Sequence, residues 1–349
     1  VYKELKDDYI KTHEIQLYLI LNFIYKEETE LSKIIYTIGK FYYDGEIIKQ
    51  NFHIAKEYFD ISAKMEYSDA IFHIGKLYSL GQGVEQNYKK AKEYYERAVK
   101  QNHSSSMNEL GRFYEEGLGV ETNIHKAIEY YESAIKLNDP YAFCRMAHLY
   151  QHGIGVEENI QKAFEYYTIS AKQNVPESLL NLGFLYQTGV YVKIDYQKSK
   201  QFYEMAVKFK LPKAYTNLGF LYQFGQGVEQ NYQKAIEYFL IAASSKEPNA
   251  INNLGTLYFN GQGVERNYEK AREYFESASK LNFIVSIHNL GIIYKKGLGV
   301  PKDYLLAKDY FEKSSDLEQS LYQIGKLYYH GYGVEKDFVR AKNFFEITE

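Results

Sequence analysis

One cysteine and two histidines have the residue types and the spacing of metal ligands. In the segment CRMAHLYQH, Cys144, His148 and His152 recur at every fourth residue, which places them on one face of a helix. Thiolate and imidazole groups bind zinc, but only neighbouring members of such a row can share one ion, and a fourth ligand must come from elsewhere. Most such rows are groove or surface residues. We therefore treat the three residues as a metal candidate and predict that they hold no tightly bound zinc.

Other patterns do not support catalysis. The segment GQGVEQN, which begins at Gly81, resembles a phosphate loop in composition, but such a loop needs Gly-Lys-Ser/Thr between a strand and a helix. His148 is not followed by the Glu of a His-Glu-x-x-His metalloprotease. Acidic residues alternate with lysine at helical spacing, as in KKAKEYYE, which is typical of a solvent-facing surface. No nucleophile turn or cofactor fingerprint is present. We predict no enzyme activity, no catalytic residue and no cofactor.

The elements that carry these residues repeat along the chain. The heptapeptide NLGFLYQ occurs at 181–187 and again at 217–223, a spacing of 36 residues. A glycine, or once an alanine, recurs with this spacing along the chain, except that the last spacing is 34 residues. A tyrosine stands three residues after each of these positions. A fixed period of this length indicates an array of repeats. The repeated positions, called comb positions below, are Gly39, Gly75, Gly111, Ala147, Gly183, Gly219, Gly255, Gly291 and Gly325.

Each repeat is predicted to form two short helices. Apolar residues of DAIFHIGKLYSL recur at helical spacing, and Gly81 can adopt the left-handed conformation that ends a helix. The second helix begins after Asn87, and only Asn or Asp occurs at the equivalent positions, as expected of an N-cap. A glycine at the comb position allows neighbouring helices to approach closely. Because helices of about 12 residues are marginal alone, the pairs must pack on one another. We predict an all-α, right-handed solenoid of about nine 36-residue repeats.

The repeated pattern A-x-x-x-L-G-x-x-Y-x-x-G-x-G-V-x-x-N-Y-x-K-A-x-E-Y-Y-x-x-A resembles the Sel-one-like repeat, a relative of the tetratricopeptide repeat. The likeness covers residues 32–349, which we predict to be nine such repeats, and residues 1–31 are predicted to form a divergent N-terminal helical cap. The chain departs from the pattern at Ile47 and Tyr191, which replace the second loop glycine. We expect differently shaped loops there.

Composition narrows the function classes. The 349 residues include 45% hydrophobic residues and carry a net charge of −3, with no basic block, which argues against non-specific nucleic-acid binding. The apolar run LYLILNFIY at 17–25 is too short to cross a bilayer. Cys144 is the single cysteine, so a disulfide scaffold is excluded. We expect a reducing, cytoplasmic compartment, or the endoplasmic reticulum if a signal peptide precedes Val1.

The resemblance implies that the first helix of each repeat lines a concave groove, with the residues two before, one after and four after the comb position pointing into it. Those positions would make the groove basic in its N-terminal part and amide-rich and aromatic in the middle. Regularly spaced amides could pair with an extended peptide backbone; alternatively, asparagine is simply a good solvent-facing residue beside Leu-Gly. The candidate residues are Asn181, Asn217, Asn253, Asn289, Phe184, Phe220, Phe224, Phe259, Lys40, Lys76 and Arg112.

We therefore expect a non-catalytic scaffold or adaptor that binds an extended protein segment in this groove. The resemblance also implies two alternatives: a regulatory repeat domain of a larger enzyme such as a kinase, or a substrate adaptor of a ubiquitin ligase complex in degradation at the endoplasmic reticulum. The last helix carries Phe344, Phe345 and Ile347 with no later repeat to cover them. Either more chain follows Glu349, or this end contacts another protein such as a second copy.

Overall fold

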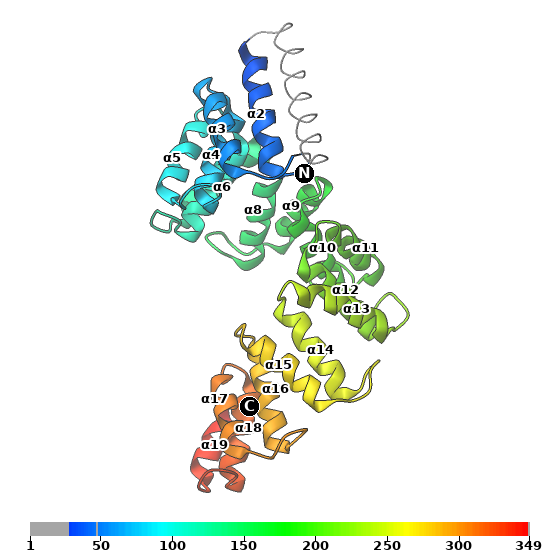
Figure 1. Cartoon of the computed structure of the whole chain (residues 1–349). Helices are drawn as coiled ribbons and strands as arrows, with labels where there is room; N and C mark the ends of the chain where they lie inside the picture. The colour runs from blue at the N-terminus through cyan, green and yellow to red at the C-terminus, as the bar shows by residue number, and fades with distance from the viewer. Residues whose placement is uncertain (1–27, 47, 348–349) are drawn as a thin grey trace, which may run out of the picture. The chain divides into compact units, whose positions relative to one another are not determined.

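The computed structural model describes residues 28–46 and 48–347, and within these residues the only regular elements are α-helices. The helices follow one another as antiparallel pairs (Figure 1), each pair corresponding to one repeat. The all-α solenoid of helix pairs predicted from the sequence is therefore confirmed. The predicted cap at 1–31 lies almost entirely outside the described residues, and its existence stays a prediction.

The chain divides into two compact units, and unit 1 extends to Val175. In each of its helix pairs a first helix packs against the second helix that follows it. The helices of unit 1 are α2 (Glu28–Asp44), α3 (Phe52–Lys64), α4 (Ser68–Leu80), α5 (Tyr88–Val99), α6 (Ser104–Glu116), α7 (Ile124–Lys136), α8 (Pro140–His152) and α9 (Ile160–Lys172).

Unit 2 begins at Pro176 and has the same construction. Its even-numbered helices are the first helices of their repeats. They are α10 (Pro176–Thr188), α11 (Tyr196–Val207), α12 (Pro212–Phe224), α13 (Tyr232–Ser244), α14 (Pro248–Asn260), α15 (Tyr268–Ser279), α16 (Ile284–Lys296), α17 (Tyr304–Lys313), α18 (Glu318–His330) and α19 (Phe338–Ile347).

The ends of the helices are set by the residues that the sequence marked. The Asn87 side chain accepts a hydrogen bond from the backbone N–H of Lys90 at 2.9 Å, which satisfies one of the free donors at the start of α5. Gly81 ends α4 with φ of 67°, in the left-handed region where a side chain is strained. The predicted N-caps are confirmed at every second helix, at Asn51, Asn87, Asn123, Asn159, Asp195, Asn231, Asn267, Asp303 and Asp337.

The comb glycines bring the two helices of a pair into contact. A Cβ built on Gly219 would lie 2.5 Å from Cε1 of the buried Phe239 ring, and one on Gly75 would lie 2.6 Å from Cε1 of Tyr95. Both distances are too short for a real contact. The second-helix ring therefore occupies the space of the missing side chain, and the prediction that these glycines allow close helix approach is confirmed.

The loop after α10 differs from the others, as expected. Most loops have a second glycine with φ of 66–70°, whereas Tyr191, at that place in the α10 loop, is not among the residues of positive φ. Ile47, where the same difference was expected, lies outside the described residues. The loop after α10 also exposes Val190 and Ile194.

Candidate binding face on the first helices

Within each unit, groove positions of one repeat contact groove positions of the next. In unit 1, the Lys76 ammonium lies 5.7 Å from the centre of the Tyr43 ring, and the Tyr43 and His73 rings are 5.4 Å apart. In unit 2, Lys295 Nζ donates to Gln323 Oε1 at 2.6 Å. Positions two before, one after and four after the comb therefore form one continuous surface within each unit. We call this surface the first-helix face.

The four asparagines of unit 2 lie on this face but in different environments. Asn181 and Asn217 are half-buried. Asn289 is also half-buried, and its Nδ2 donates to Asn252 Oδ1 at 3.1 Å. Asn253 is only 9% exposed, and its Nδ2 has no hydrogen-bond partner among the described residues. The structure thus brings the row together, although its members are not equally accessible.

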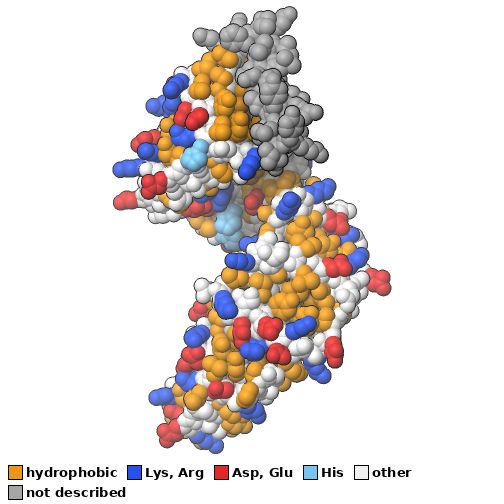
Figure 2. All heavy atoms as spheres, in the orientation of Figure 1, with side chains coloured by type: hydrophobic (Ala, Val, Ile, Leu, Met, Phe, Trp, Pro, Cys, Tyr) orange, Lys and Arg blue, Asp and Glu red, His pale blue; other side chains and the backbone are white. Residues whose placement is uncertain are grey.

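The aromatic candidates divide into exposed and packed residues. Phe184 is 44% exposed; Phe224, which lies five residues after the comb and adjoins the face through Phe220, is 59% exposed. Phe220 stacks on Phe224, with ring centres 6.1 Å apart, and meets the buried Phe239 edge-on. Phe259 instead packs among core residues, edge-on to Tyr268 at 5.3 Å. Figure 2 shows hydrophobic side chains gathered on the visible surface of unit 2 where α10 to α13 lie.

The sequence interpretation missed the hydrogen bonds beneath this face. Where the second-helix ring is tyrosine, the residue four after the comb can accept from its hydroxyl. The Tyr131 hydroxyl donates to Glu115, that of Tyr167 to Gln151 and that of Tyr203 to Gln187. A Glu or Gln followed 16 residues later by tyrosine was the sequence signal for this bond; the shorter Ser79, 16 residues before Tyr95, does not form it. Gln223 has the acceptor but is followed by Phe239, and its Oε1 has no partner among the described residues.

The cations predicted to make the N-terminal part basic are largely neutralised. Lys40 forms an ion pair with Asp44 at 2.8 Å, and Arg112 forms ion pairs with Glu109 at 2.9 Å and with Glu116 at 3.0 Å. All of these acids lie one helical turn from the cation. The first-helix face of unit 1 therefore carries less free positive charge than the row of Lys40, Lys76 and Arg112 indicates.

His73 replaces asparagine on the face of unit 1 and is buried. Its ring lies among those of Tyr36, Tyr43, Phe59 and Phe72, 5.2 to 5.4 Å from each. Burial lowers the pKa of the imidazole from 6.5 to about 4, although the Asp69 carbonyl, 2.8 Å from Nδ1, acts in the opposite direction. His73 is therefore a neutral packing residue at pH 7.

The metal candidate lies on α8. Cys144 is half-buried, while His148 and His152 are exposed with ring centres 4.6 Å apart. Partial burial and, to a smaller extent, the neighbouring His152 lower the pKa of His148. Across the described part of the chain, no group of three His, Cys, Asp or Glu side chains has the arrangement of a metal site. The absence of tight zinc binding stays a prediction.

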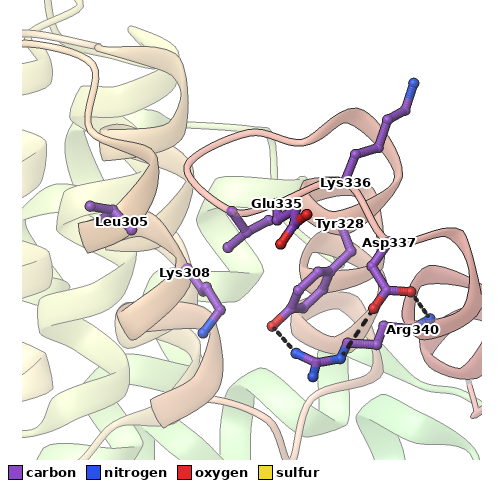
Figure 3. A pocket seen from close by; sticks show the side chains of 8 residues that line it. Leu305, Lys308, Tyr328, Glu335, Lys336, Asp337 and Arg340 are labelled. Carbon is purple, nitrogen blue, oxygen red and sulfur yellow. Dashed lines mark hydrogen bonds and ion pairs between the residues drawn. The ribbon is translucent and has the colours of Figure 1, made fainter.

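Two cavities lie away from the first-helix face, each beside a tyrosine that stands three residues after a comb position. One of about 530 Å³ is lined by Lys308 of α17, Tyr328 of α18 and Arg340 of α19. Figure 3 shows the Tyr328 hydroxyl pointing into the space between Lys308 and Arg340. Arg340 donates to this hydroxyl at 3.5 Å and pairs with Asp337 at 3.3 Å. These contacts engage the Arg340 guanidinium within the chain.

The same arrangement recurs in unit 1, where a cavity of about 350 Å³ is lined by Tyr78, Lys90 and Tyr94. Tyr78 stacks on Tyr94 with ring centres 5.8 Å apart, and the Lys90 ammonium lies 5.3 Å from the centre of the Tyr78 ring. The tyrosine three residues after the comb therefore holds the second helix by stacking and cation–π contacts.

In the portion of the chain that the structure covers, no helix combines the length and apolar character needed to span a bilayer.

Two aromatic side chains of the last helix, α19, pack on α18. Phe344 stacks on Tyr328 at 6.1 Å, and Phe345 contacts Tyr322 at 5.5 Å. Both phenylalanines are half-buried against α18, whereas Ile347 is 63% exposed. The expected contact of this end with further chain or another protein stays a prediction.

Comparison with solved structures supports the fold. A protective antigen of uropathogenic Escherichia coli with an SLR fold is 24% identical, with a TM-score of 0.57 over 92% of this chain and 77% of that one. A Sel1 repeat protein from Oxalobacter formigenes is 29% identical, with a TM-score of 0.60 over 72% of this chain and 98% of that one. A comparison with curated proteins finds no significant match.

The family model described as "Sel1 repeat" matches nine times, at residues 35–67, 68–103, 104–139, 140–175, 176–208, 212–246, 248–283, 284–319 and 318–347. Solenoids of this family are generally non-catalytic and typically serve protein–protein interaction. Since the matches cover nearly all of the described helices, the chain belongs to the Sel1 repeat family.

Proposed function

We propose that the chain is a non-catalytic scaffold and that the first-helix face of unit 2 binds a protein segment in extended conformation. The observation that carries this proposal is the pair of exposed rings, Phe184 on α10 and Phe224 on α12, beside the half-buried amides Asn181 and Asn217. Exposed aromatic side chains on a shared face are typical of sites that anchor a partner.

The two kinds of side chain have complementary roles in this proposal. Covering an exposed phenylalanine with an apolar partner side chain stabilises a complex by up to about 2 kcal/mol. An amide both donates and accepts hydrogen bonds, so Asn181 and Asn217 can pair with peptide groups regardless of the partner's side chains. Phe220 supports Phe224 by stacking on it. Phe259 supports the face from within the core.

In this proposal, unit 1 favours acidic residues of a partner less strongly than its three candidate cations suggest. Lys40 and Arg112 are paired with acids of their own helices. Lys76 lies over the Tyr43 ring, so its charge stays available for a second partner. We therefore assign any preference for acidic residues near this end mainly to Lys76.

The test uses the purified chain and a displayed library of random twelve-residue peptides. Selected peptides are synthesised, and their affinities are measured for the wild type, Phe184→Ala and Phe224→Ala. We expect each variant to weaken binding at least tenfold without a change in thermal midpoint, because both rings are exposed. Leu240→Ala, at a 48% exposed side chain of the second helix α13, is the matched control and should bind normally.

Two outcomes would contradict the proposal. One is the failure to select any peptide above background. The other is a set of peptides whose affinity is the same for Phe184→Ala, Phe224→Ala and the wild type, since the binding surface would then lie elsewhere.

The cytoplasmic location and the absence of a nucleic-acid partner are further proposals that agree with the single cysteine and the net charge of −3. A contact through the C-terminal end is also proposed, with Phe338 56% exposed, Val339 72% and Ile347 63%. Light scattering tests whether this contact joins two copies. The roles as a regulatory domain of an enzyme or as an adaptor in degradation are supported only by the family resemblance.

A further inference from the structure

The hydroxyl of Tyr203 shows how polar side chains of neighbouring repeats meet beneath the first-helix face. This hydroxyl, on the second helix α11, donates to Gln187 Oε1 on α10 at 2.8 Å. Burial raises the pKa of Tyr203, while the nearby side chains of Ser199 and of Asn217 on α12 oppose that shift. One oxygen atom thus lies between a glutamine of one repeat and an asparagine of the next.

Thirty-six residues later the same three positions are Gln223, Phe239 and Asn253. The ring has the same placement in both repeats. A Cβ on Gly183 would lie 2.4 and 2.6 Å from Cε1 and Cδ1 of Tyr203, and a Cβ on Gly219 would lie 2.5 and 2.7 Å from the same atoms of Phe239. The difference between the two repeats is therefore the hydroxyl itself, which Phe239 lacks.

The two amides around Phe239 show the consequence. Gln223 is 5% exposed and Asn253 is 9% exposed, and both the Gln223 Oε1 acceptor and the Asn253 Nδ2 donor are without a partner among the described residues. These are the atoms that a hydroxyl at this place would satisfy, since it would donate to the glutamine and accept from the asparagine. Buried polar groups of proteins are rarely left unpaired, so this pair calls for a ligand.

Other repeats with phenylalanine at this position resolve the problem internally. Around Phe311, Lys295 reaches Gln323 directly at 2.6 Å. Around Phe59, the equivalent positions are the aromatic rings of Tyr43 and His73, in contact at 5.4 Å. Around Phe275, the residue four after the comb, where Gln187 and Gln223 stand in their repeats, is the apolar Phe259. That repeat therefore has no acceptor to satisfy at this position.

We infer that Gln223 and Asn253 bind a side-chain hydroxyl of the partner segment, that of a serine or threonine, which donates to Gln223 Oε1 and accepts from Asn253 Nδ2. This inference rests on the proposed function of the first-helix face. A backbone peptide group fits less well, because its N–H and C=O point in opposite directions whereas a hydroxyl does both with one atom. The terminal amide torsions of Gln and Asn are broad, so both amides can turn toward the face to meet the hydroxyl.

The position of the site agrees with the proposed binding face. Gln223 immediately precedes the exposed Phe224, which stacks on Phe220 of the same helix. The partner's serine or threonine would therefore bind next to the apolar anchor, and the two features together would select a segment that has both.

The experiment fills the site from inside the protein with Phe239→Tyr. Because the ring placement matches that of Tyr203, the new hydroxyl should meet both amides, and the thermal midpoint should rise by about 2 °C or more. The probes are the peptides selected on the wild-type chain in the test above. Peptides with serine or threonine should bind Phe239→Tyr at least tenfold more weakly than the wild type.

A double-mutant cycle isolates the hydroxyl. Replacing the peptide serine by alanine should weaken binding to the wild type at least fivefold and leave binding to Phe239→Tyr unchanged. The matched control is Phe275→Tyr, which adds a hydroxyl at the same place over Gly255 but next to Phe259. That variant should gain no stability, and its affinity for the peptides should equal that of the wild type.

The outcomes separate the two proposals. If peptides are selected and depend on Phe184 and Phe224 but bind Phe239→Tyr as tightly as the wild type, the hydroxyl site is wrong and the binding face stands; a higher midpoint with unchanged affinity would mean that an internal water fills the space. If Phe239→Tyr lowers the midpoint, the hydroxyl does not meet the amides and the site is also wrong. If no peptide is selected, the binding face is wrong and the inference falls with it.

Discussion

Gly219 on α12 and Phe239 on α13 are in contact so close that a single added carbon would not fit. A Cβ on Gly219 would lie 2.5 Å from Cε1, 2.7 Å from Cδ1 and 2.9 Å from Cζ of the fully buried ring. The ring is rigid and surrounded by the core of the helix pair, so it has little room to yield.

Gly219→Ala should therefore destabilise unit 2, although alanine is favoured over glycine in a helix by about 1 kcal/mol. Overpacking typically costs about 1–3 kcal/mol, so we expect a net loss of up to about 2 kcal/mol in a urea titration. Lys213→Ala, at an exposed position of the same helix, should leave the midpoint unchanged. A stabilised Gly219→Ala would show that the pair can separate and that the close contact is not required.

The buried histidine predicts a pH dependence of stability. The pKa of His73 is about 4 in the folded protein, chiefly because of burial and further through Lys40 and Lys76, and about 6.5 in the unfolded chain. Between these values the unfolded state binds more protons, so the stability that this group contributes is present above pH 6.5 and is lost as the pH falls toward 4. The loss should amount to about 3 kcal/mol.

Urea midpoints at several pH values test this expectation. His73→Gln cannot protonate, so its stability should fall less than that of the wild type between pH 6.5 and 4. His125→Gln, on the exposed side of α7, is the control and should reproduce the wild-type profile. Parallel curves for the wild type and His73→Gln would show that the imidazole is not responsible.

The asparagines of the binding face should contribute to affinity more than to folding. Asn217 is half-buried, and Nδ2 of Asn253 has no hydrogen bond to another described residue that the substitution would remove. A lost hydrogen bond to a partner costs about 1 kcal/mol, so Asn217→Ala with Asn253→Ala should weaken peptide binding at least tenfold while the thermal midpoint barely changes. Asn289→Ala removes the bond to Asn252 and should lower the midpoint instead. An equal loss of stability in the double variant would make the asparagines structural.

The row on α8 should not hold zinc. His148 and His152 are neighbours on an exposed face, but the described residues supply no third ligand in a metal-binding arrangement. Elemental analysis of chain purified without chelators should find far less than one zinc per chain. One equivalent of zinc that disappears in His148→Ala and persists in His330→Ala would overturn this prediction.

The repeat could be predicted from the sequence because its signals are local. A glycine that ends a helix, an Asn or Asp that caps the next one and a fixed spacing of comb positions are each read from a few neighbouring residues. Asn87 and Gly81 are in the predicted roles, since capping depends on backbone groups within one turn of the residue itself. The same locality explains why the row of Asn181, Asn217, Asn253 and Asn289 was visible as a row.

The sequence by itself therefore determined the helix pairs, their ends and the positions that share a face. What each side chain on that face is free to do was decided only by tertiary structure, because burial and hydrogen bonding depend on residues of other helices. Phe224 is exposed while Phe259 is packed, although both are aromatic and on first helices. Gln187 and Gln223 end identical heptapeptides, yet one receives the hydroxyl of Tyr203 and the other faces the ring of Phe239. That difference comes from a residue 16 positions away on the packed second helix, and only the contact between the two helices gives it a consequence.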